Sequence, residues 1–154
     1  MGVGTLYGVN ATLVASGGQS KILQGMVDGR VKCMIDSYVT LGTGEDATST
    51  VAMGRALPKG ARILNVILTL SKALSSSVTL DVGDLSDPNR YLDSVACSAE
   101  IVTDIVENNL SAGLNYIIGT DTSTDDTQIL VTIADQNNAV ADAVIKVIVL
   151  YALD

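Results

Sequence analysis

The sequence predicts an all-β protein, an antiparallel β-sandwich of about eight strands with a jelly-roll-like arrangement. Short segments alternate apolar and polar residues, turn residues separate them about every ten positions, and helical periodicity is nowhere sustained. Aromatic residues make up only 3% of the chain, and all five are tyrosine. The core must therefore consist of aliphatic side chains, which pack well on pleated sheets.

The length of 154 residues fits one domain, which can bury roughly 70% of the surface of its unfolded chain. We divide the sequence into an N-terminal arm at 1–29 and a β-sandwich domain at 30–154. The arm is rich in glycine, so ordering it costs much entropy for little burial. We expect an extended arm that is ordered against a neighbouring subunit; a loose terminus with one short strand is an equal alternative.

The first strand of the domain is predicted at residues 30–40, followed by an acidic, glycine-containing turn and a short strand at 50–53. Alternation within the first strand places Val31, Cys33, Ile35 and Val39 on the core side.

Residues 55–93 are interpreted as a hairpin-like unit around which the domain is organised. Pro58 and Gly60 preset a tight turn before a strand at 61–70, and a serine-rich connection leads to a second strand at 78–82. The predicted inner face of the first of these strands comprises Leu64, Val66, Leu68 and Leu70. The opposite face comprises Ile63, Asn65, Ile67 and Thr69.

The second half of the chain has less regular patterns. A turn is predicted at 83–89, and residues 90–93 fit an extended segment or a helical turn. Residues 94–108 are ambiguous between helix and strand, and we favour irregular structure followed by a strand from residue 100. Further strands are predicted at 114–120, 128–135 and 143–153.

Two strands, 61–70 and 143–153, are largely apolar on both faces. Such strands lie inside a sheet or contact a partner, because an exposed apolar surface marks an interface. The residues predicted to form this interface are Ile63, Ile67, Ile145, Val147, Val149 and Tyr151.

The chain contains no histidine, so a catalytic acid or base at neutral pH would have to be another group. No nucleophile elbow, phosphate-binding glycine loop or zinc-binding cysteine pattern is present, and we predict neither an enzyme nor a cofactor. Cys33 and Cys97 are expected to be reduced, buried and unpaired. Two carboxylate clusters are weak candidates for a Ca²⁺ site, although solvated turn residues are the better interpretation. The first cluster comprises Asp81, Asp84 and Asp87, and the second comprises Asp121, Asp125 and Asp126.

The net charge of −8 disfavours direct binding to nucleic acid, which requires clustered lysine and arginine. No secretory signal and no apolar run of membrane-spanning length is visible, so we expect synthesis in a cytoplasm and no membrane partner.

Three stretches resemble the small virion proteins of tailed bacteriophages, in particular the capsid decoration (cement) proteins. They are residues 54–63 (GRALPKGARI), 79–84 (TLDVGD) and 87–91 (DPNRY), about a quarter of the chain. The resemblance implies a β-sandwich, often a homotrimer, that binds the major capsid protein on the outer surface of the capsid. It implies a location in the virion, where the protein holds capsomers together.

Three other functions remain open at this point. One is another position in the virion, as a head–tail connector, head-fibre or tail component. A carbohydrate-binding jelly roll is less favoured, because only tyrosine is available to stack on sugar rings. A small enzyme has no candidate residues.

Overall fold

We describe the protein from a computed structural model, which covers residues 30–42, 49–107, 113–121, 125–134 and 140–153. These ranges contain eight strands and no helix. The strands are β1 (Val31–Val39), β2 (Thr50–Met53), β3 (Ala61–Leu70), β4 (Thr79–Gly83), β5 (Leu92–Ala96), β6 (Ile101–Asp104), β7 (Ile129–Ala134) and β8 (Val144–Leu153). The predicted arm at residues 1–29 lies outside the described residues.

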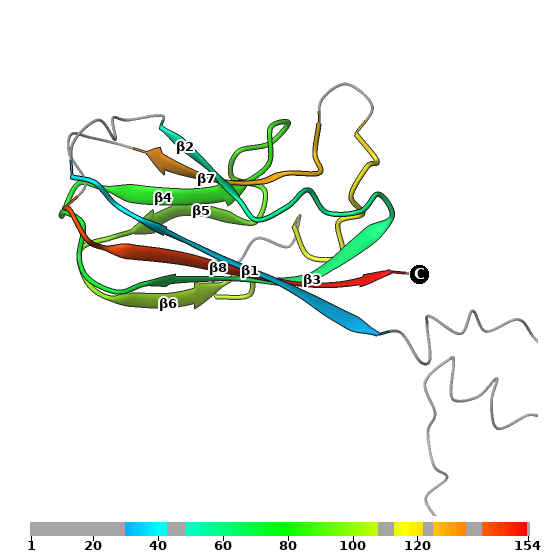
Figure 1. Cartoon of the computed structure of the whole chain (residues 1–154), viewed down its shortest axis with the longest axis horizontal. Helices are drawn as coiled ribbons and strands as arrows, with labels where there is room; N and C mark the ends of the chain where they lie inside the picture. Colours follow the sequence, from blue (N-terminus) through cyan, green and yellow to red (C-terminus); the bar gives the residue numbers. More distant parts are fainter. Residues whose placement is uncertain (1–29, 43–48, 108–112, 122–124, 135–139, 154) are drawn as a thin grey trace, which may run out of the picture.

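The strands form two four-stranded antiparallel sheets that pack face to face (Figure 1). The first sheet has the order β1-β8-β3-β6, and the second has the order β2-β7-β4-β5. Each strand of the first half pairs with its counterpart in the second half: β1 with β8, β2 with β7, β3 with β6 and β4 with β5. This is the topology of a rolled-up long hairpin, and it confirms the predicted jelly-roll sandwich.

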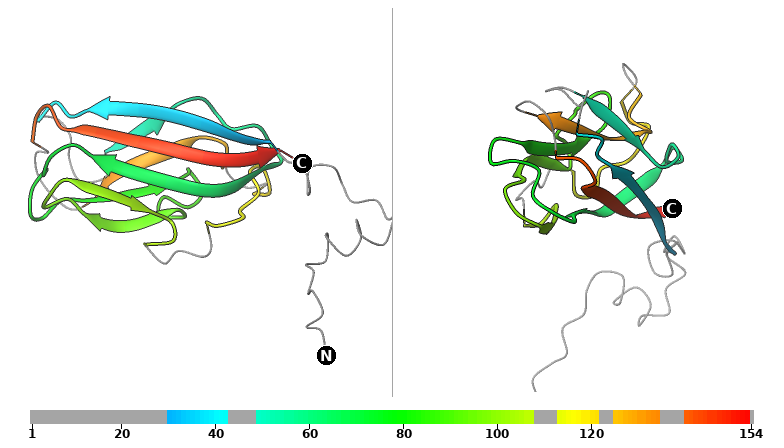
Figure 2. Two further views of the ribbon diagram at one scale, coloured as in Figure 1. Left: turned by 90° about the horizontal axis from the view of Figure 1, so that it is seen from below. Right: turned by 60° about the vertical axis from the view of Figure 1, so that its left-hand side comes forward.

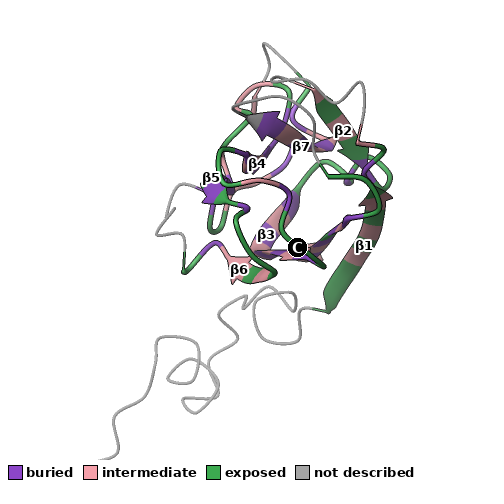
Figure 3. Cartoon of the chain, turned by 90° about the vertical axis from the view of Figure 1, so that its left-hand side faces the viewer, coloured by how far each residue is buried: buried purple, intermediate pink, exposed green. Residues whose placement is uncertain are grey.

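The core lies between the two sheets and is mainly aliphatic, as the composition predicts, with Tyr91 as its one aromatic residue among those described. Side chains from both sheets are fully buried there, including Leu68, Val147 and Val149 of the first sheet and Leu80 and Val131 of the second. Figure 3 shows buried residues along strands of both sheets. No helix in the described part of the chain is long and apolar enough to cross a membrane.

The predicted hairpin-like unit is wrong in its pairing. β3 belongs to the first sheet and β4 to the second, so the connection between them crosses from one layer to the other. Alternation identifies strands but carries no information about which strands pair. A strand can bury its apolar face equally well as a member of either sheet.

The predicted inner face of β1 is also wrong. Val31, Ile35 and Val39 are 60%, 62% and 49% exposed, and Cys33 is exposed as well. The register with β8 places Met34 beside Val149, which is a core residue. The side chains of β1 that turn inward are therefore Met34, Asp36 and Tyr38, all partly buried.

A β-bulge changes which side chains of β3 face the core. Ile63 pairs with Tyr151 and Asn65 with Leu150, so Leu64 is an extra residue in the ladder. The bulge brings Ile63 into the core together with Val66 and Leu68, whereas Leu64 is only partly buried.

Two further segments differ from the prediction. Residues 92–96 form β5, where we expected an extended segment or helical turn up to residue 93 and irregular structure after it. Residues 114–120 form turns and a single bridge between Ile117 and Arg62 in place of the expected strand. The backbone of this segment still bonds to β3 and the residue before it, through Ile63 N–Tyr116 O and Gly60 N–Ile118 O contacts of 2.9 and 2.8 Å.

Candidate interaction surface

The outer face of the first sheet carries an apolar band where solvent-facing strands normally carry polar side chains. Directly paired residues share a face, so Ile35, Ile148 and Ile67 form one row across β1, β8 and β3. Cys33 and Leu150 form the next row, and Val31 pairs with Ala152 beyond it. We define the apolar band as Val31, Cys33, Ile35, Ile67, Ile148 and Leu150.

The members of the apolar band are exposed to different degrees. Val31, Cys33 and Ile35 on the edge strand are exposed, whereas Ile67, Ile148 and Leu150 are partly buried by their neighbours. Polar residues border the band, with Arg62 and Asn65 toward one end and Lys146 and Thr69 toward the other. An apolar centre with a polar rim is the composition of a protein–protein contact.

The six residues predicted as an interface separate into two groups. Ile63, Ile145, Val147 and Val149 are fully buried between the sheets and are part of the core in this structure. Ile67 and Tyr151 are partly exposed, and Ile67 belongs to the apolar band. Four of the six predicted residues thus face the core, because alternation cannot assign the inner face of a strand such as β8 that is apolar on both sides.

An open groove of about 730 Å³ lies beside β1. It is lined by Tyr151 and by two segments, residues 33–36 of β1 and residues 54–57 of the connection between β2 and β3. The Asp36 carboxylate accepts hydrogen bonds from Gly54 N at 2.7 Å and Ser37 N at 2.8 Å. These bonds lower the pKa of Asp36, so the carboxylate stays ionised and ties the connection to β1.

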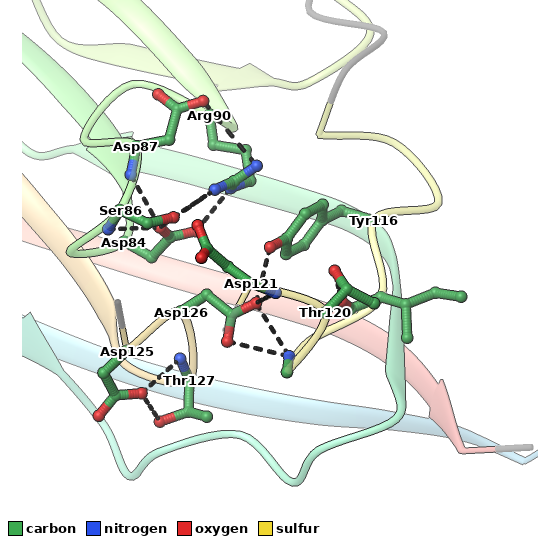
Figure 4. A network of polar contacts seen from close by, with 12 residues as sticks. Asp84, Ser86, Asp87, Arg90, Tyr116, Thr120, Asp121, Asp125, Asp126 and Thr127 are labelled. Atoms are coloured by element: carbon green, nitrogen blue, oxygen red, sulfur yellow. Dashed lines mark hydrogen bonds and ion pairs between the residues drawn. The ribbon is translucent and has the colours of Figure 1, made fainter. Parts of the chain in front are cut away.

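The carboxylate candidates lie together at one end of the sandwich, in two clusters of polar contacts (Figure 4). In the first cluster the buried Asp84 accepts a bond of 2.6 Å from Arg90 Nε. The other Asp84 oxygen accepts bonds from Ser86 N and Asp87 N, both at 3.0 Å. The turn is compact, since a Cβ on Gly83 would lie 2.1 Å from the carbonyl oxygen of Asp87.

The second cluster is centred on Asp126, which is 1% exposed. Its carboxylate accepts bonds from the Tyr116 hydroxyl at 2.6 Å, Gly119 N at 2.9 Å and Asp121 N at 3.3 Å. Burial opposes ionisation of Asp126, but these hydrogen bonds outweigh it and the pKa is lowered. The Arg90 guanidinium lies 3.9 Å from the centre of the Tyr116 ring and so connects the two clusters.

These contacts define what the clusters do chemically. The oxygens of Asp84 and Asp126 accept hydrogen bonds from the surrounding loops, and Asp125 accepts bonds from both the backbone and the hydroxyl of Thr127. In the described part of the chain, no group of three or more potential ligands is arranged to hold a metal ion. We interpret the clusters as clamps that fix the loops between β4 and β5 and before β7.

The two cysteines lie in different environments and are not bonded to each other. Cys97 is buried, as predicted, and burial raises the pKa of its thiol to about 12. Cys33 is exposed, because its strand presents the opposite face from the one predicted.

Comparison with known proteins adds information about the fold. No protein-family model and no curated protein sequence matches the chain. A chain in the solved capsid asymmetric unit of cyanophage Pam1 is 24% identical with a TM-score of 0.64, and the match covers 82% of this chain and 86% of that one. A chain in the solved capsid of Ralstonia phage GP4 is 19% identical with a TM-score of 0.58, covering 81% and 85%. The likeness establishes that the sandwich is shared with chains found in phage capsid structures.

Proposed function

We propose that the protein is a structural component of a tailed-phage virion that binds the outer surface of the capsid and stabilises contacts between capsomers. The observation that carries this proposal is the apolar band on a solvent-facing sheet. Burial of apolar side chains from water gives about 25 cal/mol per Å², so such a surface favours association. The fold shared with chains of two phage capsid structures supports a place in the virion.

The proposal includes self-association as a homotrimer and a major capsid protein as the partner. A trimer presents three copies of each binding surface, so weak individual contacts with a repeating shell add up to strong attachment. The clamps around Asp84 and Asp126 would keep the loops of each copy rigid, which reduces the entropy lost on binding.

The described tyrosines argue against the carbohydrate-binding alternative. Tyr91 is fully buried, and Tyr38, Tyr116 and Tyr151 are partly buried. A sugar-binding platform requires an exposed aromatic face, which Tyr91 does not present, and the ring face of Tyr116 is covered by the Arg90 guanidinium.

The copy number in purified virus particles tests the proposal. A decoration protein is expected in amounts comparable to the major shell protein, measured by quantitative mass spectrometry of particle digests. A small fraction of that amount would indicate the connector, head-fibre or tail alternative. Absence from purified particles, with the protein present in the infected cell, would contradict a virion role altogether.

Binding to isolated shells then tests whether the apolar band is the contact surface. Ile35→Lys places a charge within the apolar band and should abolish co-sedimentation with shells stripped of this protein. The matched control is Thr50→Lys, an exposed position on the second sheet. Equal loss of binding in both variants would show that the band is not the contact.

A further inference from the structure

β1 is an edge strand of the first sheet, and its outward backbone groups from Val31 to Ile35 are unpaired within the described part of the chain. Thr40 N donates to Ala143 O at 2.9 Å, so the even-numbered residues of β1 bond to β8. The odd-numbered residues Val31, Cys33 and Ile35 therefore direct their N–H and C=O groups away from the sheet. Native proteins normally protect such an edge, because it is a template for another strand.

Features on both sides of this edge leave it accessible. Figure 3 shows β1 along the side of the sandwich with long exposed stretches. The groove between residues 33–36 and residues 54–57 keeps the inner side open. Toward the end of the strand the edge is closed, because Ser37 N is bonded to the Asp36 carboxylate. The accessible edge is thus the half from Val31 to Ile35.

The charged residues near this half of β1 become complementary when two copies of the strand run antiparallel to each other. Arg30 is exposed immediately before the strand, and Asp36 lies just after the accessible half. If two copies run antiparallel with Cys33 at the centre, Arg30 of each copy lies opposite Asp36 of the other. In the same register Val31 lies opposite Ile35, which joins the two apolar bands on the outer face.

We propose that two copies of this chain pair through the β1 edge, centred on Cys33, so that their four-stranded first sheets become one continuous sheet. The contact is isologous and therefore twofold. It is separate from a trimer contact, which joins two different patches of each copy, and it does not depend on whether the protein binds a capsid.

Disulfide trapping tests the register in the full-length protein. Residues in a hydrogen-bonded antiparallel pair have Cα atoms about 5.5 Å apart, a separation that a disulfide can bridge. Mild oxidation should therefore convert the protein to a covalent dimer on a non-reducing gel. Cys33→Ser should abolish the dimer, whereas Cys97→Ser should leave it unchanged because Cys97 is buried.

A proline substitution tests the backbone pairing without relying on the cysteine. The Val31 N–H is unused inside the described chain, so Val31→Pro should fold normally but lose an intermolecular hydrogen bond and block the approach of the second strand. We expect its dimer dissociation constant, measured by sedimentation equilibrium in reducing buffer, to rise at least about tenfold, or about 1.4 kcal/mol. Val31→Ala keeps the N–H and should change the constant much less.

Three results would overturn the proposal. One is a monomer at every concentration up to the solubility limit. Another is an oligomer whose mass and affinity are the same in Val31→Pro and Val31→Ala. The third is an associated protein in which Cys33 does not cross-link on oxidation. The copy number of the protein in virus particles bears on none of these, so failure of this inference and failure of the proposed function are distinguishable.

Discussion

The two outer faces of the sandwich have opposite character although the two sheets share one core. Across the first sheet the central outward row is Ile35, Ile148 and Ile67. Across the second sheet the corresponding residues are polar, with Thr50 beside Thr132 and Thr132 beside Asp81. Both sheets satisfy the requirement for an apolar inner face, so folding alone does not explain the difference. The apolar outer face of the first sheet is therefore the part of the molecule that indicates a partner.

The largest expected effect is a difference in folding between a substitution on the inner face of β8 and one on its outer face. Val147 and Ile148 are neighbours on β8, but Val147 is fully buried and Ile148 is partly exposed. Val147→Asp should abolish cooperative folding, since it buries a carboxylate without a partner. Ile148→Asp should remain folded, as monitored by circular dichroism and thermal unfolding. If both variants fold, β8 does not divide core from surface as described.

The second effect concerns the polar clamp that supports the second sheet. Asp84→Ala leaves Arg90 without its carboxylate partner and the 83–87 turn without its acceptor, and should cost about 3 kcal/mol of unfolding free energy. Urea denaturation of the wild type and the variant measures this loss of unfolding free energy. The control Asp87→Ala should cost far less, because the Asp87 side chain lies 3.9 Å from the guanidinium and is more exposed. Equal costs would contradict the central role of Asp84.

The third effect tests whether the difference between the outer faces matters for association. Replacing Ile67 and Ile148 together by threonine gives the first sheet the polarity of the second. The double variant should weaken association or shell binding by about tenfold, since roughly 0.8 kcal/mol is lost for each buried methylene-sized group. Its thermal stability should change little. The control is Thr132→Ser on the second sheet, which should leave association unchanged.

A smaller effect is expected from pH. The pKa of Asp126 is lowered in the folded state, so its contribution to stability is present above its ordinary value of 3.8 and is lost as the pH falls through the folded pKa. The difference in unfolding free energy between wild type and Asp126→Asn should therefore shrink below about pH 4. A difference in unfolding free energy that is independent of pH would show that the charge of Asp126 does not contribute to stability.

The smallest effect is a difference in thiol reactivity. Cys33 should react with a thiol reagent in the native monomer, whereas Cys97 should react only after unfolding, because it is buried and its pKa is raised to about 12. Titration of native and denatured protein with a chromogenic disulfide counts the reactive groups. Protection of Cys33 at concentrations where the protein associates would place it within the contact.

The sequence by itself determined the class of the fold and most of its strands. Alternation and turn residues identify seven of the eight strands, all but β5, because strand periodicity is a local property that neighbouring residues reveal. The absence of histidine and the isolated cysteines likewise limit the chemistry without any knowledge of the fold.

Only the tertiary structure decided which faces of β1, β3 and β8 are buried. In β8 both faces are largely apolar, so alternation cannot distinguish the core side from the outer side, and in β1 the more apolar face is the outer one. The bulge at Leu64 shifts the pattern of β3 by one residue, and the register with β8 turns Ile35 outward and Met34 inward. Pairing between distant strands sets these orientations, and for that reason the apolar band became visible only in the folded structure.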